Sequence, residues 1–145
     1  MIDSILLVDD EDLFHLVFED ACSLLDITLS LKSIRSSDEA GRLFKKWFDE
    51  GSSIERPECV FVDLNIIGSS FDGIELIRKI NFEYGNHVVI GIISSSNEST
   101  EQAKAVQAGA QFWIIKSDDI EPRLEEFKKD YDSYKNRTAP FKVYR

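Results

Sequence analysis

Short apolar runs alternate with amphipathic stretches along the chain. Unbroken apolar runs are typical of strands buried on both faces, and apolar residues spaced three or four apart are typical of helices packed on one side. The pattern predicts strands at 5–8, 27–31, 59–62, 88–93 and 112–115. It predicts helices at 13–25, between Ser36 and Gly51, between Asp72 and Gly85, between Ser99 and Gly109, and within 119–135.

Local signals refine some of these elements. Apolar and polar residues alternate at 27–31, which predicts a strand with one exposed face near the edge of a sheet. Ser36 with Glu39, and Ser99 with Gln102, have the spacing of a capping box, so each serine is expected to cap a helix.

The elements occur as strand then helix, five times in succession. Such alternation predicts an α/β fold, in which helices cover both faces of a parallel sheet. Ligands of these folds bind outside the carboxyl ends of the strands. Residues that directly follow a strand are therefore the candidates for a functional site.

Length and composition narrow the class of protein. A chain of 145 residues suits one domain with a core of its own. Its net charge of −10 disfavours binding to nucleic acid and anionic lipid. No apolar run approaches the ~20 residues of a membrane span, and no signal peptide begins the chain, so a cytoplasmic protein is expected. Cys22 and Cys59 lie in apolar patterns and are expected to be buried free thiols.

Polar residues whose side chains can bind ligands or take part in catalysis follow four of the five strands. Asp9 and Asp10 follow the first, Asp63 the third, Ser94 the fourth and Lys116 the fifth. If the first and third strands are neighbours, three carboxylates converge, and such an all-oxygen cluster favours Mg2+. Together with a hydroxyl and an ammonium group, the cluster could bind a phosphoryl group. A carboxylate could also act as the nucleophile and form an aspartyl phosphate.

The order and spacing of these motifs resemble the receiver domain of bacterial two-component response regulators, of the chemotaxis-regulator type. The resemblance covers about residues 3–130. It is carried by Ile5–Glu11, Val60–Asn65, Asp72-Gly73, Ser94, Ala108–Ala110, Trp113 and Lys116. It implies a flavodoxin-like, doubly wound, five-stranded parallel sheet of order 2-1-3-4-5 with five helices. The receiver domain is expected over residues 1–136, followed by a C-terminal tail at 137–145.

The resemblance also assigns the acidic residues. Asp63 would accept a phosphoryl group from a sensor histidine kinase or a histidine phosphotransfer protein, with Mg2+ as the cofactor. Asp10 would bind Mg2+ directly and Asp9 through a metal-bound water, with Asp63 as a further ligand. The backbone carbonyl of Asn65 would complete the protein ligands.

The remaining site residues would form the switch and its output. Ser94 would hydrogen-bond the phosphoryl group, Trp113 would turn inward behind it, and Lys116 would pair with it. The response would appear on the face of the fourth helix, fifth strand and fifth helix, where a downstream protein or a second copy would bind. Because 29 residues follow Lys116, too few for an output domain, a stand-alone signalling module rather than an enzyme is expected.

Three departures from the family pattern are visible. The segment 65–71 is longer than usual and lacks the usual proline. Ser117 replaces the cis-proline that usually follows the lysine, and a cis bond before a non-proline costs about 2.5–4 kcal/mol, so a trans bond is expected. Trp113 is larger than the usual tyrosine or phenylalanine, so its inward position could be the resting state.

Several alternatives stay open at this stage. Asp10-Glu11-Asp12 resembles the Asp-x-Asp motif of haloacid dehalogenase-type phosphohydrolases. A flavodoxin-like nucleotide site is disfavoured, because these acids would repel phosphate. A degenerate receiver that only binds partners is also considered.

Two further features lie outside these motifs. His15 and His87 are expected to be solvated or capping residues. The aromatic and basic tail is expected to dock on its own domain or on a second copy.

Overall fold

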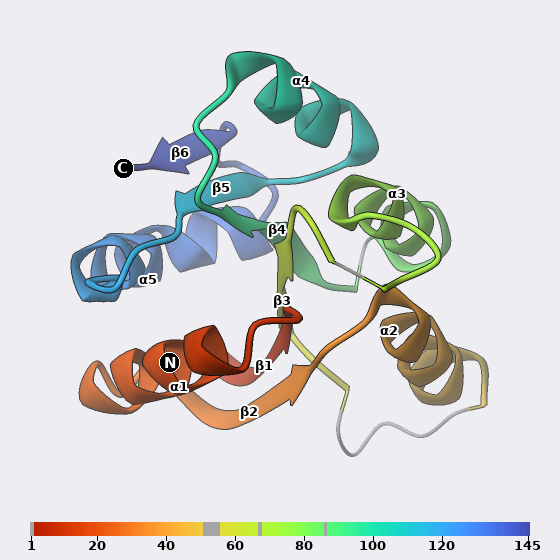
Figure 1. Ribbon diagram of the computed structural model, residues 1–145, viewed down its shortest axis with the longest axis horizontal. Helices are drawn as coiled ribbons and strands as arrows, with labels where there is room; N and C mark the ends of the chain where they lie inside the picture. Colours follow the sequence, from red (N-terminus) through yellow and green to blue (C-terminus); the bar gives the residue numbers. More distant parts are fainter. Residues whose placement is uncertain (1, 51–55, 67, 86) are drawn as a thin grey trace.

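The computed structural model describes residues 2–50, 56–66, 68–85 and 87–145, and it has three layers, a parallel sheet between two layers of helices (Figure 1). The sheet order is β2-β1-β3-β4-β5-β6, and every neighbouring pair is parallel. The strands are β1 (Ile2–Val8), β2 (Thr28–Ile34), β3 (Cys59–Asp63), β4 (Val89–Ser94), β5 (Phe112–Ile115) and β6 (Lys142–Tyr144).

The described part of the chain has five α-helices, as the sequence predicts. They are α1 (Asp12–Leu24), α2 (Ser37–Phe44), α3 (Gly73–Tyr84), α4 (Ser99–Ala108) and α5 (Glu121–Lys135). A π-helical turn at Lys45–Asp49 continues α2 and buries Trp47. Among these described residues no helix is both long and apolar enough to cross a bilayer.

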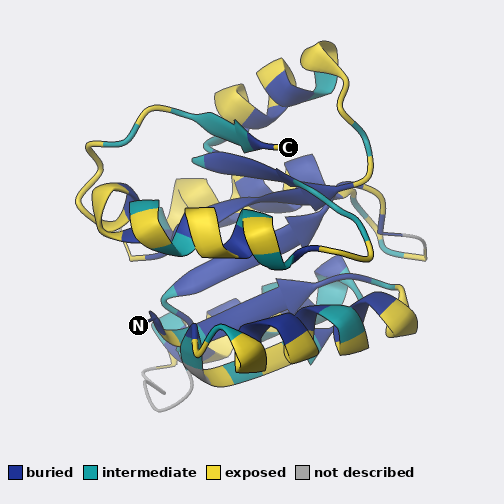
Figure 2. Cartoon of the chain, turned by 90° about the vertical axis from the view of Figure 1, so that its left-hand side faces the viewer, coloured by how far each residue is buried: buried dark blue, intermediate teal, exposed yellow. Residues whose placement is uncertain are grey.

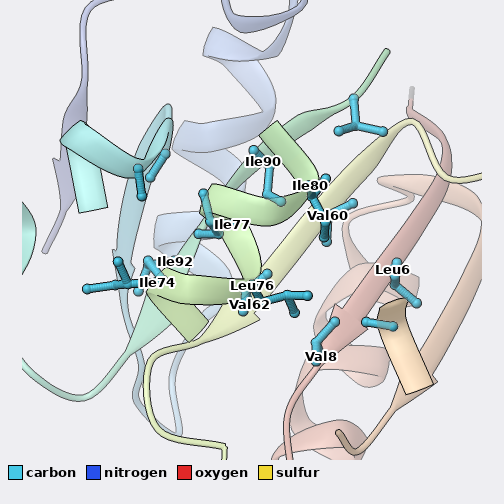
Figure 3. Close-up of a cluster of buried hydrophobic side chains, with 14 of the residues drawn as sticks. Leu6, Val8, Val60, Val62, Ile74, Leu76, Ile77, Ile80, Ile90 and Ile92 are labelled. Atoms are coloured by element: carbon cyan, nitrogen blue, oxygen red, sulfur yellow. The ribbon is translucent and has the colours of Figure 1, made fainter. Parts of the chain in front are cut away.

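Successive strand residues point to opposite faces of the sheet and so build two cores. Leu6, Val60 and Ile90 face α2, α3 and α4, and Figure 3 shows the α3 residues Ile77 and Ile80 packed over these strands. The intervening strand residues face α1 and α5 in a second core rich in aromatic rings. Figure 2 shows the result, with buried strands inside and the outer sides of the helices exposed. Burial on both faces holds the ends of β1, β3 and β4 in place.

The sheet has one more strand than the five expected. The expected order 2-1-3-4-5 is present, and β6, from the predicted tail, adds in parallel to the outer edge of β5. The side chain of Tyr144 is buried, and its hydroxyl lies 2.8 Å from that of Tyr134 and donates to Asp130 over 2.7 Å. The tail therefore docks on its own domain. A strand of three residues is too short to show a periodic pattern in the sequence.

The two predicted capping boxes have different outcomes. The Oγ of Ser36 accepts a hydrogen bond from the backbone N–H of Glu39 over 3.1 Å, which confirms the first cap. The second prediction is wrong, because Ser99 is already the first residue of α4. The capping position belongs to Glu98, whose backbone is extended and whose side chain makes no capping bond.

Candidate functional site

Three carboxylates converge at the carboxyl edge of the sheet. Asp9 and Asp10 follow β1, and Asp63 ends β3. These strands are neighbours, with Val8 paired to Val62, so their ends lie side by side. One oxygen atom from each of the three carboxylates lies within 4.8 Å of the others. Asp9 and Asp63 are buried and Asp10 is half-buried.

Lys116 brings a positive charge from the end of β5 to this cluster. Its Nζ lies 2.7 Å from Asp9 Oδ2, 2.9 Å from Glu11 Oε1 and 3.8 Å from Asp63 Oδ2. The ammonium also lies 4.4 Å from the centre of the Phe14 ring. Its closest carboxylate partners are therefore Asp9 and Glu11 rather than Asp63. Sequence reasoning did not single out Glu11, although it directly follows the acidic pair.

The surroundings change the acidity of the two central groups. Burial raises the pKa of Asp63 to about 7, and the negative charges of Asp9, Asp10 and Glu11 act in the same direction, opposed by Lys116. Burial lowers the pKa of Lys116, but its contacts with Asp9 and Glu11 outweigh this, and its pKa is raised. The lysine is thus charged at neutral pH, whereas Asp63 is partly protonated until a cation offsets the crowded negative charge.

Asp9 is held in place by its own neighbours. Its carboxylate Oδ1 accepts a hydrogen bond from the backbone N–H of Glu11 over 2.8 Å. The Nε2 of His15 donates a hydrogen bond to the backbone carbonyl of Asp9. His15 is only 5% exposed, so the expectation that it is a solvated or capping residue is wrong. The first turn of α1 places His15 over the end of β1. The sequence does not predict this contact, because His15 has no partner at the spacing of a metal-binding motif.

The carboxylate cluster fits a hard divalent cation. All its donor atoms are oxygen, and negatively charged oxygens are the ligands that Mg2+ prefers. Asn65, which the resemblance adds to this set, is exposed and follows β3. It lines a hollow of about 560 Å³, together with Ser96 and side chains of α3 and α4, whereas the three carboxylates of the cluster do not line this hollow.

Ser94 and Trp113 are joined through Ser96. Ser94 ends β4, is 3% exposed, and its Oγ accepts a hydrogen bond from the Ser96 N–H over 3.1 Å. The indole Nε1 of Trp113 donates to the Ser96 carbonyl over 3.0 Å. Trp113 is fully buried, so its ring is inside the protein in this state. The serine and the tryptophan are therefore coupled by one residue of the β4–α4 loop.

The long loop after Asp63 is tied to the start of α2. The Oγ of Ser37 donates to the Phe71 carbonyl over 2.8 Å, and the Ser70 N–H donates to Asp38 Oδ2 over 3.0 Å. The described residues contain no cis peptide bond, so the bond that follows Lys116 is trans, as expected.

Comparison with known proteins gives a family match. The family model described as "Response regulator receiver domain" matches residues 5–126. A search of curated proteins found no match.

Solved structures share the fold at low sequence identity. The phosphorylated cyanobacterial phytochrome response regulator RcpA is 19% identical, with 96% of this chain and 97% of that chain covered and a TM-score of 0.72. The Mn2+-bound response regulator Rcp1 is also 19% identical, with 90% and 92% covered and a TM-score of 0.70. NtrX from Brucella abortus is 20% identical, with a TM-score of 0.76 and 94% of this chain covered, but the match spans only 29% of that longer chain.

Proposed function

The chain belongs to the response regulator receiver domain family of two-component signalling, and from this premise we propose that Asp63 is its phosphoacceptor. The phosphoryl donor is a phosphohistidine on a sensor histidine kinase or a phosphotransfer protein. The observation that carries the proposal is the position of Asp63, buried at the end of β3 between an acidic pair and the ammonium of Lys116. The protein acts as a cytoplasmic signalling module rather than as a turnover enzyme.

The transfer is a displacement at phosphorus. An oxygen of the Asp63 carboxylate attacks, the bond between phosphorus and the donor imidazole nitrogen breaks, and its electron pair stays on the imidazole. Lys116 pairs with the phosphoryl oxygens, and the Ser94 hydroxyl donates a hydrogen bond to them. Asp9, Asp10 and Asp63, with the backbone carbonyl of Asn65, would hold Mg2+, which supplies further positive charge for these oxygens. The Mn2+-bound state of the related Rcp1 supports a divalent cofactor.

The signal leaves the site through the Ser94–Ser96–Trp113 link. When Ser94 turns its hydroxyl toward the phosphoryl group, the hydrogen bond that it accepts from the Ser96 N–H changes. The Ser96 carbonyl then shifts, and the Trp113 indole that donates to it changes position. The population of conformations on the α4–β5–α5 face shifts, and a downstream protein reads the change. Because β6 covers the outer edge of β5, a homodimer on this face would use α4 and α5 rather than the backbone of β5.

Labelling with a small phosphodonor tests the site. Acetyl phosphate with Mg2+ is expected to add one phosphoryl group to the wild type, detected by intact-protein mass spectrometry, and none to Asp63→Asn. The Asp12→Asn variant is the matched control, since Asp12 pairs with Arg35 over 2.5 Å and is 78% exposed. Equal labelling of Asp63→Asn would show that the assignment is wrong.

These preparations, with Asp10→Asn added, separate the alternatives. An unlabelled wild type would favour a receiver that acts only as a binding module. Steady hydrolysis of p-nitrophenyl phosphate that is lost in both Asp10→Asn and Asp12→Asn would favour the phosphohydrolase.

A further inference from the structure

We propose that Glu11 restrains the ammonium of Lys116 and thereby slows phosphoryl transfer to Asp63. Glu11 is a positioning residue, which acts through the lysine rather than on the phosphoryl group itself. The inference rests on the proposed function and adds a control over its rate.

The ammonium of Lys116 lies closer to Glu11 than to Asp63. Its Nζ lies 2.9 Å from Glu11 Oε1 but 3.8 Å from Asp63 Oδ2, so the pairing with Glu11 is the shorter. The contacts with Asp9 and Glu11 use two of the three N–H donors of the lysine, and Asp63 lies beyond hydrogen-bond distance of the third. The ammonium must therefore move away from Glu11 to bond a phosphoryl group on Asp63. The lysine side chain is only 8% exposed, so water is a poor substitute for either partner.

Glu11, rather than Asp9, is the partner that can release the lysine. The Asp9 side chain is fully buried, and its other carboxylate oxygen is held by the Glu11 backbone N–H. Freeing Asp9 would leave a buried charge without its cation, which is strongly unfavourable. The Glu11 side chain is 63% exposed, so its carboxylate can turn into water at little cost. The Glu11–Lys116 ion pair is thus a restraint on the ammonium that can be released, and it is called the latch.

Rates of labelling in a single turnover test the latch. Glu11→Gln keeps the shape of the side chain but removes the charge that holds the ammonium. With acetyl phosphate at fixed Mg2+, the Asp63 phosphorylation rate is expected to rise about two- to fivefold, the range set by a partly exposed ion pair. Asp12→Asn removes the same charge one residue away from Glu11, on a side chain paired with Arg35, and is expected to leave the rate unchanged.

A double-mutant cycle separates the latch from simple repulsion of the anionic donor. In a Lys116→Ala background, Glu11→Gln is expected to have no effect on the rate, because there is no ammonium left to release. A rate increase that persists without the lysine would overturn the latch and leave only repulsion. Melting temperatures of all variants check that each is folded.

The remaining outcomes are also decisive. A wild type that is labelled, with a Glu11→Gln variant labelled at the same rate or more slowly, would overturn the latch alone. A wild type that is not labelled would overturn the proposed function, and the latch with it.

Discussion

At the residue scale, the carboxylate of Asp63 combines burial with crowded negative charge. These surroundings raise its pKa to about 7, from the ordinary value of 3.8. An acid whose pKa is higher in the folded state holds its proton more tightly there, so the free energy of unfolding falls as pH rises from about 4 to 7. The crowded negative charge also favours a bound cation. A divalent ion offsets the repulsion between Asp63 and the neighbouring carboxylates, which protonation of Asp63 otherwise relieves.

Asp63→Asn is therefore expected to stabilise the metal-free protein in a pH-dependent way. In EDTA, the variant and the wild type should differ little in stability near pH 4, because Asp63 is protonated in the folded state and its pKa in the unfolded state lies close to this pH. The variant should be more stable by about 2–4 kcal/mol at pH 8, where the wild type carries the buried charge. Urea unfolding at each pH measures the difference.

Two controls accompany this measurement. Asp12→Asn, which removes a carboxylate that is 78% exposed, is the control for losing a negative charge that is not buried. Adding Mg2+ should raise the stability of the wild type more at pH 8 than at pH 6, because at pH 6 the ion must first displace the proton that Asp63 still holds. A stability difference for Asp63→Asn that is the same at pH 4 and pH 8 would contradict the charge-burial explanation.

At the element scale, α3 begins against the end of the strand that carries Asp63. The N–H of Gly73 donates to the Leu64 carbonyl over 3.0 Å. A Cβ at position 73 would lie 2.1 Å from the backbone oxygen of Asp63, far inside contact distance. Glycine is needed at position 73 because the backbone at the start of α3 contacts the backbone at the end of β3. A side chain there could be accommodated only by displacing the end of the strand or the start of the helix.

Gly73→Ala is expected to destabilise the fold by about 1–3 kcal/mol, as overpacking does, and to lower the labelling of Asp63. Thermal unfolding and acetyl phosphate labelling measure the two effects. Gly41→Ala in α2 is the matched control, since its nearest neighbour beyond that helix is 4.0 Å away, at the tip of Lys79. That change should stabilise the helix by about 0.5–1 kcal/mol. Equal effects at both positions would argue against the close contact.

At the scale of the whole molecule, β6 closes one edge of the sheet. It pairs with β5, and the buried Tyr144 anchors it through Tyr134 and Asp130. An open strand edge offers unpaired backbone groups to other chains. The C-terminal segment therefore affects both the stability of the domain and its tendency to associate.

Deleting residues 138–145 is expected to lower the melting temperature and to cause concentration-dependent association. The buried Tyr144 is lost, and the outer edge of β5 is exposed. Calorimetry and light scattering over a concentration series measure these effects. Tyr144→Phe is the control that keeps the strand, and losing its hydroxyl bonds should cost only about 1 kcal/mol. A truncated protein that melts like the wild type and stays at one mass would contradict this role of β6.

Much of the fold follows from the sequence alone. Strand and helix signals are local, since they depend on the spacing of apolar residues and on the residue types at helix ends. Their alternation predicts a parallel sheet with helices on both faces, and the structure confirms it. Because parallel strands end at a common edge, the same reasoning predicts that Asp9, Asp10 and Asp63 come together, as they do.

Only the tertiary structure decides the contacts between residues far apart in the chain. Glu11 and Lys116 are separated by 105 positions, and no local pattern shows that this carboxylate lies on that ammonium. The burial of His15 and the pairing of β6 with β5 likewise depend on where whole elements pack. The sequence thus determines which groups reach the edge of the sheet. Packing decides which of them touch, because contact distances are set by the positions of the elements and not by any one segment.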